Sequence, residues 1–411
     1  MNFSSTFRIN HLVFIGINYQ PERATGDKNF WVDLVAELSF QVNRITILSI
    51  RQEPIPETTF QLNQCQIRIK YLSPKLLQTS VQGKSERGGE FSTRRGVLEK
   101  FLNINRIMQE LTRIAQSDPF QHIHLLDNLG YANRAIAKFQ SASGRVTVSA
   151  MAYQGKTPRW VYERYLRLSY RHPNLTVVPY SQAYAQKLGR FGIEPDRICR
   201  IPWGVKVSET KVVNESDKKT LKSAMQLQPD VPLILWAGYL QQLRKNDFIT
   251  AYRLAQNLLN SGLNAQVYFA FKPECFDSQF AQLHQPEKKI WVQSTAVGQF
   301  EQLCGASDIF YSPFFNQECI IAPPLTWLEM LNRGNPIVST SVPGAEEVII
   351  PGETGYLCRT ESDLVDGLTQ AIARYKNMRT ACINLIKTKY NIQDIAKQYL
   401  ALFNGSPKSL A

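Results

Sequence analysis

The sequence has no long apolar run. None of its 411 residues falls in a stretch of about 18 consecutive apolar residues, the length that a membrane-spanning helix requires. The first ten residues are mostly polar and lead directly into a strand-like run from His11 to Gly16, which is typical of the start of a domain and not of a signal peptide. We therefore expect a cytoplasmic protein whose contact with a membrane, if it has one, is peripheral.

Cysteine and histidine are also scarce. The seven cysteines are scattered, odd in number and free of any Cys-x-x-Cys pair, so we expect reduced thiols and neither disulfides nor a zinc site. Two of the five histidines, His122 and His124, alternate along a predicted strand, but no third metal ligand accompanies them. We expect them at the polar end of that strand, close to Asp127, and we predict no metal and no other cofactor.

Several catalytic motifs are absent as well. The sequence contains no Gly-x-x-x-x-Gly-Lys-Ser/Thr loop and no Gly-x-Ser-x-Gly elbow, so P-loop nucleotide hydrolysis and serine-hydrolase chemistry have no support. Lys and Arg exceed Asp and Glu by 47 to 34, a formal net charge of +13, which favours nucleic acid, anionic lipid or phosphorylated small molecules as partners. Because no nucleic-acid motif is recognisable, we do not expect a nucleic-acid partner.

Part of the basic excess is concentrated between residues 156 and 171, where cations and aromatic residues are interleaved. Two interpretations remain open. On a helix these residues would form a surface suited to an anionic bilayer, or they would form a solvated helix whose long side chains cover an apolar base. The cations are Lys156, Arg159, Arg164, Arg167 and Arg171, and the aromatic and apolar residues are Trp160, Tyr162, Tyr165, Leu166, Leu168 and Tyr170.

The order of strand and helix patterns predicts two α/β domains. A chain of 411 residues is long for a single core. Strands and helices alternate through the first half, give way to a polar, charged stretch from Lys206 to Lys222, and restart with a strand at Leu233. We predict two Rossmann-like domains with parallel sheets, facing each other across a cleft, at residues 1–205 and 206–385. An amphipathic C-terminal helix in residues 386–411 would cross back to the first domain.

One stretch of the second domain carries most of the chemistry. Pro323 or Pro324 can occupy the first turn of a helix that ends before Gly334, and a β-branched strand follows. The amino terminus of such a helix presents free N–H groups, which suit an anion. Glu329 lies on this helix among apolar residues and therefore needs a partner, for which a ribose diol would serve.

A second loop of this domain is cationic. Gly238 ends a predicted strand, and Arg244 and Lys245 follow on the loop. Such a pair could neutralise the charge that develops on a diphosphate leaving group.

Over about residues 230–375 the sequence resembles the C-terminal domain of retaining glycosyltransferases of the GT-B fold, family 4 type. The matching features, in order and spacing, are the Gly238 to Lys245 loop, Ser307 to Pro313, Glu329 with Gly334 and Pro336, Pro343 to Val348, and Gly352 to Leu357. The first half resembles the acceptor-binding domain more loosely, through Asn18 to Pro21 with Gly26 and through Phe191 to Ile198 with Ile201 to Val205.

The resemblance implies an enzyme that moves a sugar from a nucleoside-diphosphate sugar to a hydroxyl of a glycan, a lipid-linked acceptor or a small molecule, with retention and without a metal. It implies that Glu329 holds the ribose, that Arg244 and Lys245 bind the diphosphate, and that the backbone at Ile321 and Ala322 contacts phosphate or sugar. Gly238 and Glu347 would also lie on the donor side. Gly26 would open the acceptor side, where Asp127 is a further candidate.

The sequence departs from the family pattern at three places. The first family glutamate, eight positions before Glu329, falls at Ile321, and Glu318 would replace it if the loop carries a three-residue insertion. The usual arginine after the glycine is Tyr239, and the strand that ends at Met151 lacks the family's donor-contacting histidine. An alternative function follows, namely a catalytically degenerate GT-B domain that binds a sugar nucleotide or a partner protein. An epimerase is a further alternative, but no acid–base pair supports it.

Overall fold

The structure is a computed structural model. It describes residues 9–16, 27–50, 56–72, 94–126, 136, 146–149, 159–170, 172–207, 213–238, 245–273, 276, 278–315 and 320–405. The chain divides into two compact units. Unit 1 comprises Met1–Trp203 with Ile392–Ala411, and unit 2 comprises Gly204–Asn391. The divisions therefore fall between 203 and 204 and between 391 and 392, whereas the sequence analysis places them after 205 and after 385.

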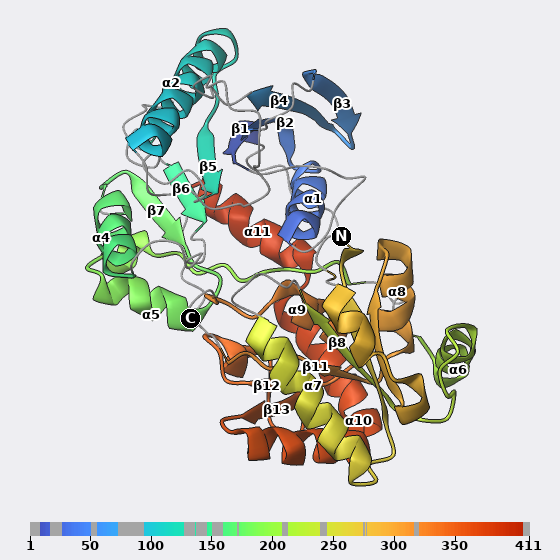
Figure 1. Cartoon of the computed structure of the whole chain (residues 1–411). Coiled ribbons are helices and arrows are strands. Elements are labelled where there is room, and N and C mark those ends of the chain that lie inside the picture. The colour runs from blue at the N-terminus through green and yellow to red at the C-terminus, as the bar shows by residue number, and fades with distance from the viewer. Residues whose placement is uncertain are drawn as a thin grey trace, which may run out of the picture. The chain divides into compact units, whose positions relative to one another are not determined.

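Unit 1 is built on a seven-stranded sheet with the order β3-β4-β2-β1-β5-β6-β7 (Figure 1). The strands are β1 (Ile9–Ile15), β2 (Val42–Ile50), β3 (Thr58–Leu62), β4 (Cys65–Leu72), β5 (His122–Leu126), β6 (Val146–Ser149) and β7 (Leu175–Val178). The helices are α1 (Asp27–Leu38), α2 (Arg94–Ser117), α4 (Arg159–Tyr170), α5 (Gln182–Arg190) and α11 (Ile392–Phe403).

All strand pairs of this sheet are parallel except one. The edge strand β3 runs antiparallel to β4, and Asn63, with a φ of 52°, lies in the tight turn between them. Asparagine tolerates this left-handed conformation better than most residues. The sequence analysis predicted parallel strands only and missed β3, because three of its five residues are exposed and it lacks the apolar run of a covered strand.

The C-terminal helix α11 belongs to the core of unit 1. It packs against α1, and its Tyr399 and Phe403 are buried. The Phe403 ring lies edge-on to Phe14 of β1 with a centroid distance of 6.2 Å, and Tyr399 lies 6.5 Å from Trp31 of α1. Residues from the two ends of the chain therefore share one apolar layer.

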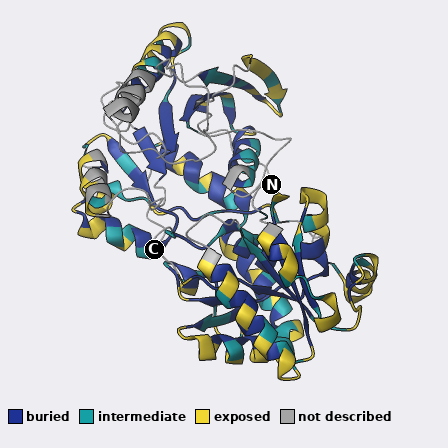
Figure 2. Cartoon of the chain, viewed as in Figure 1, coloured by how far each residue is buried: buried dark blue, intermediate teal, exposed yellow. Residues whose placement is uncertain are grey.

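Unit 2 is built on a six-stranded parallel sheet with the order β10-β9-β8-β11-β12-β13. The strands are β8 (Leu233–Gly238), β9 (Gln266–Phe271), β10 (Ile290–Ser294), β11 (Ile309–Tyr311), β12 (Ile337–Thr340) and β13 (Gly355–Cys358). The α-helices are α6 (Glu215–Ala224), α7 (Lys245–Asn260), α8 (Val297–Ala306), α9 (Leu325–Asn332) and α10 (Glu361–Lys389). In Figure 2 the strands are mainly buried, and the exposed residues lie mostly on the helices.

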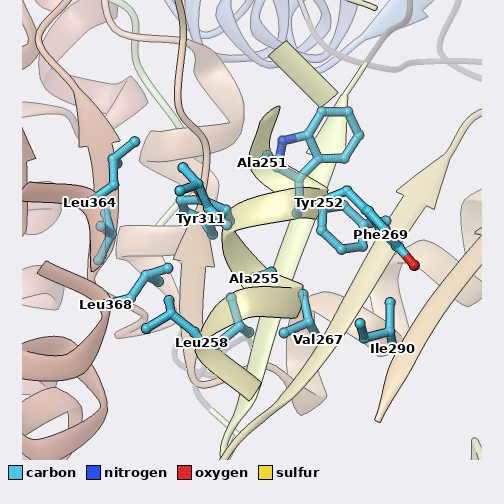
Figure 3. Close-up of a cluster of buried hydrophobic side chains, with 14 of the residues drawn as sticks. Ala251, Tyr252, Ala255, Leu258, Val267, Phe269, Ile290, Tyr311, Leu364 and Leu368 are labelled. Atoms are coloured by element: carbon cyan, nitrogen blue, oxygen red, sulfur yellow. The ribbon is translucent and has the colours of Figure 1, made fainter. Parts of the chain in front are cut away.

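One apolar cluster of unit 2 joins α7, the central strands and the first half of α10 (Figure 3). Ala251, Ala255 and Leu258 of α7 face the sheet, because they recur at the spacing of one helix face. Leu364 and Leu368 of α10 pack into the same layer. Both helices therefore cover the same face of the sheet.

The predicted fold class is confirmed: the protein is α/β, with two domains built on parallel sheets. One helix of the second domain was missed. The polar stretch from Lys206 to Lys222, after which the sequence analysis has the alternation restart, overlaps α6 over about its last half, from Glu215 onward. Lys218 and Lys222 of that helix are 3% and 4% exposed, so two charged residues of this stretch are buried.

Candidate functional site

The carboxyl ends of neighbouring strands bring several predicted residues of unit 2 to one edge. β8, β11 and β12 are adjacent and parallel, so the segments that follow them leave from the same side of the sheet. β8 ends at Gly238, and the segments that follow β11 and β12 begin at Ser312 and Ser341. Ligands of open α/β sheets bind beyond this edge.

Glu329 lies on α9, which follows the β11 exit segment. The helix begins at Leu325 with Pro324 as its N-cap, so the proline stands one position before the first turn in which it was expected. Six of the eight helix residues are buried, and the two that are partly accessible are Thr326 and Glu329. These two residues are three apart and therefore share a face. The carboxylate of Glu329 is thus carried by the one accessible stripe of an otherwise buried helix.

The end of α9 is fixed by its neighbours. Gly334 has a φ of 82°, and a Cβ at this position would lie 2.5 Å from the side chain of Arg379. Both the left-handed backbone and the close approach require glycine. Asn332 donates from Nδ2 to the carbonyl oxygen of Lys206 at 3.1 Å. The carboxyl end of the helix that carries Glu329 is therefore fixed by contacts at Asn332 and Gly334.

Position 238 requires glycine for a structural reason that the sequence analysis did not predict. A Cβ at this position would lie 2.5 Å from the indole of Trp236, two residues earlier on β8. Trp236 is buried against Phe248 and Phe271, with ring centroids 5.5 and 5.3 Å away, so the indole has little room to move. The space beside the Gly238 backbone is therefore occupied by this indole. The contact of Gly238 with a donor stays a prediction.

The segment that leaves β11 is held by side chains of two other elements. Thr340 of β12 accepts from the Phe314 N–H at 2.7 Å and donates to the Phe314 carbonyl at 2.6 Å. Asp247, in the first turn of α7, accepts from the Phe315 N–H at 3.0 Å and is 3% exposed. Ser339 donates to the Ser312 carbonyl at 2.6 Å.

This arrangement links the two segments that were predicted to bind the donor. Asp247 stands two residues after Lys245, and Phe315 stands three residues before Glu318. The sequence analysis missed Asp247. An acidic residue in the first turn of a predicted helix was the available signal, but the segment that it would hold could not be known.

Glu347 lies in a short 3-10 helix, Ala345–Glu347, after β12. Gly344 begins this turn with a φ of 80°, a conformation that favours glycine. The Glu347 carbonyl accepts from the Tyr390 hydroxyl at 3.2 Å, and the Glu347 side chain is partly buried, whereas Glu346 is exposed. The backbone at Glu347, seven residues after the end of β12, is therefore fixed by a contact with Tyr390.

The remaining predicted residues divide into two groups. Ala322 is buried and Ile321 is partly buried, just before α9. Arg244, Glu318, Gly26 and Asp127 lie outside the described residues, as does the side chain of Lys245, whose backbone begins α7. Their roles stay predictions.

Asp308 has a structural role at the opposite end of β11. It is 1% exposed and accepts from Lys218 at 3.0 Å, from Lys222 at 2.6 Å and from the Leu233 N–H at 2.9 Å. Lys218 also donates to the Ser307 carbonyl. Burial alone would raise the pKa of Asp308, but the charges of the two lysines hold it below its ordinary value. Burial lowers the pKa of Lys218 although Asp308 opposes that change.

The two histidines of β5 are core residues. His124 is 1% exposed, and its Nδ1 and Nε2 lie 2.7 Å from Thr147 Oγ1 and 2.9 Å from Ser149 Oγ on β6. Nε2 of His122 lies 3.0 Å from the same Thr147 hydroxyl. The expectation of a polar strand end was wrong, because α11 covers this face with Tyr399 and Phe403. Within the described ranges no cluster of three or more His, Cys, Asp or Glu could hold a metal ion.

Comparison with known proteins finds that part of unit 2 is similar to one described family. Residues 232–377 match the family model described as glycosyl transferases group 1. This segment contains β8 to β13 with α7, α8, α9 and the first half of α10, and therefore every described donor-side residue. A search of curated proteins found no match to the sequence.

Solved glycosyltransferase structures share the fold over nearly the whole chain. Sucrose-phosphate synthase from Thermosynechococcus elongatus matches with a TM-score of 0.71 and 13% identity, covering 96% of this chain and 98% of that chain. The catalytic domain of starch synthase IV from Arabidopsis thaliana, bound to ADP and acarbose, matches with 0.68 and 12%, covering 97% and 99%. HepE from Anabaena in complex with UDP-glucose matches with 0.64 and 12%, covering 96% and 99%. The fold is therefore that of GT-B glycosyltransferases.

Proposed function

We propose that this protein is a retaining glycosyltransferase that moves a sugar from a nucleoside-diphosphate sugar to a hydroxyl acceptor. The GT-B fold and the group 1 family match of residues 232–377 support a glycosyltransferase. Similar structures were solved with UDP-glucose and with ADP, which supports a nucleotide-sugar donor. Retention of configuration rests on the resemblance to the family 4 type alone.

The observation that carries the proposal is the placement of Glu329. Glu329 is one of two accessible side chains on a helix whose other side chains are buried, so its carboxylate can be reached by a ligand. An ionised carboxylate has two oxygens that only accept, and a ribose diol supplies two donors at matching spacing. Glu329 is not sealed in the core, because it shares with Thr326 the accessible stripe of α9.

The chemistry asks little of the protein beyond position and charge. In the proposed reaction the bond between the anomeric carbon and the diphosphate oxygen breaks as the acceptor oxygen bonds to that carbon, and the departing phosphate takes the acceptor proton. Arg244 and Lys245 would neutralise the charge that develops on the diphosphate. The backbone at Ile321 and Ala322 would orient the phosphate or sugar, and no metal is required.

Substitution of Glu329 tests the proposal. Glu329→Ala should abolish transfer while the protein stays folded, and Glu329→Gln should weaken donor binding by about 10- to 100-fold, because a charge-assisted hydrogen bond contributes about 1.5–3 kcal/mol. Glu346→Gln, which changes an exposed carboxylate six residues after the end of β12, is the matched control and should leave binding unchanged. Donor affinity and transfer would be measured for each variant; equal behaviour of the Glu329 and Glu346 variants would contradict the ribose role.

The alternative is a degenerate GT-B domain that binds a sugar nucleotide without turnover. Ile321, at the position of the first family glutamate, is the observation in its favour. A thermal-shift panel of nucleotide sugars would identify the donor, because a ligand that binds only the folded state raises its stability. Stabilisation by a donor, combined with neither transfer nor donor hydrolysis, would favour the binding protein.

A further inference from the structure

The helix α4 carries an exposed stripe that combines apolar and basic side chains. Trp160 is 69% exposed and Leu168 is 51% exposed, and Arg164 and Arg167 are exposed as well. Arg164, Arg167 and Leu168 follow Trp160 by four, seven and eight residues, so all four lie on one face of the helix. Exposed tryptophan is uncommon in a solvated helix, because its large apolar surface is normally covered. The aromatic side chain of Tyr170, by contrast, is buried.

The neighbouring helix α5 extends this surface. The guanidinium of Arg167 lies 5.3 Å from the ring centroid of Phe191, and the ammonium of Lys187 lies 5.8 Å from the same centroid. Phe191 caps the carboxyl end of α5, and Arg190 beside it is exposed. One aromatic ring therefore holds cations from both helices, and we call the surface formed by Trp160, Arg164, Arg167, Leu168, Lys187 and Arg190 the α4–α5 surface.

The charged residues of these two helices are mostly positive. The sequence of α4 contains three arginines and a single acid, Glu163, and that of α5 contains Lys187 and Arg190 but no acid. Two cations over one ring repel each other, and that repulsion is relieved when an anion binds beside them. The overall net charge of +13 has the same sign and adds long-range attraction to any anionic surface.

We propose that the α4–α5 surface docks on an anionic lipid bilayer. An exposed tryptophan and leucine would enter the interfacial layer, while the arginines and the lysine contact lipid phosphates. A free phosphate or a small anionic ligand would leave the two apolar side chains exposed to water. A bilayer interface can bury these side chains and contact the cations at the same time. The contact is peripheral, since among the described helices none is both long and apolar enough to cross a membrane. This inference does not depend on the proposed enzymatic function.

Sedimentation of the full chain with lipid vesicles tests the inference. The protein should bind vesicles made of equal parts phosphatidylcholine and phosphatidylglycerol, bind pure phosphatidylcholine much more weakly, and lose binding as salt is raised. Reversing both charges in the double variant Arg164→Glu, Arg167→Glu should weaken binding at least about 25-fold, at about fivefold for each cation. Trp160→Ala should also weaken it, without changing the circular dichroism spectrum.

Matched controls come from exposed residues elsewhere. Phe40→Ala removes an aromatic side chain that is 56% exposed after α1, and Arg359→Glu reverses an exposed charge of unit 2. Both should leave binding unchanged if the α4–α5 surface is the docking site. Equal binding to neutral and anionic vesicles, equal losses in the control variants, or tighter binding to single-stranded DNA than to the anionic vesicles would each overturn the proposal.

Discussion

Removing the charge of Asp308 should destabilise unit 2 strongly. In Asp308→Asn two buried ammonium groups lose the carboxylate that compensates them, since Lys218 and Lys222 are 4% and 5% exposed at the side chain and both pair with Asp308. Breaking a buried ion pair by removing one partner costs about 3–5 kcal/mol. Domain stabilities are typically about 5–15 kcal/mol, so this single change removes a large fraction of the total.

The loss should depend on pH in a defined direction. With Asp308 gone, burial would lower the pKa of Lys218 further below its unfolded value, so the unfolded state would bind more protons than the folded state. Stability of the variant then rises with pH, because the neutral amine carries no penalty for burial. The deficit relative to the unchanged protein should therefore shrink between about pH 7 and about pH 10, near the reference pKa of lysine.

Urea denaturation, followed by tryptophan fluorescence and circular dichroism, would measure the free energy of unfolding. Because two units can unfold separately, hydrogen exchange of the β8 and β11 amides would assign the transition to unit 2. The matched control is Asp230→Asn, which breaks the ion pair of the adjacent Lys219 at 2.6 Å, where the two side chains are 55% and 77% exposed. That pair should contribute little. If the two variants lose equal stability, or if the deficit of Asp308→Asn does not change with pH, the reasoning is refuted.

Two further predictions concern the exit of β11 and the core of unit 1. Asp247→Ala should reduce the turnover of sugar transfer and should expose the Phe315 amide to hydrogen exchange. Asp247→Asn keeps an acceptor for that amide and should restore both the turnover and the protection from exchange. Equal defects in the two variants would argue against a positioning role. Burial, with a smaller contribution from nearby His122, lowers the pKa of His124 well below 6.5. The unfolded state then binds more protons, so the free energy of unfolding should fall as pH drops below about 6.5, by at most about 1.4 kcal/mol per pH unit for this group. Denaturation of His124→Gln measured across pH should show a flatter slope. An unchanged slope would contradict this role of His124.

Local patterns in the sequence predicted the elements of the fold well where they depend on neighbours along the chain. The sequence analysis predicted three apolar strands, which begin at His11, Leu233 and Ile337, and the helix that carries Glu329. These predictions follow from the spacing of apolar residues and from the positions of proline and glycine. Gly334 was expected at a helix end, and its φ of 82° agrees. Strand β3 and helix α6 were missed, because neither has the apolar periodicity that marks a covered element.

The partners of buried polar residues were decided by the tertiary structure alone. Lys218 and Asp308 are 90 residues apart, and Asp247 and Phe315 are 68 apart, so no local pattern relates them. The same holds for His124, which a period-two pattern placed on one face of a strand without telling that α11 covers that face. The sequence by itself determined which residues form strands and helices, since these preferences act over a few residues. Which charges are buried together, and which aromatic residues stay exposed, was settled only when distant segments packed.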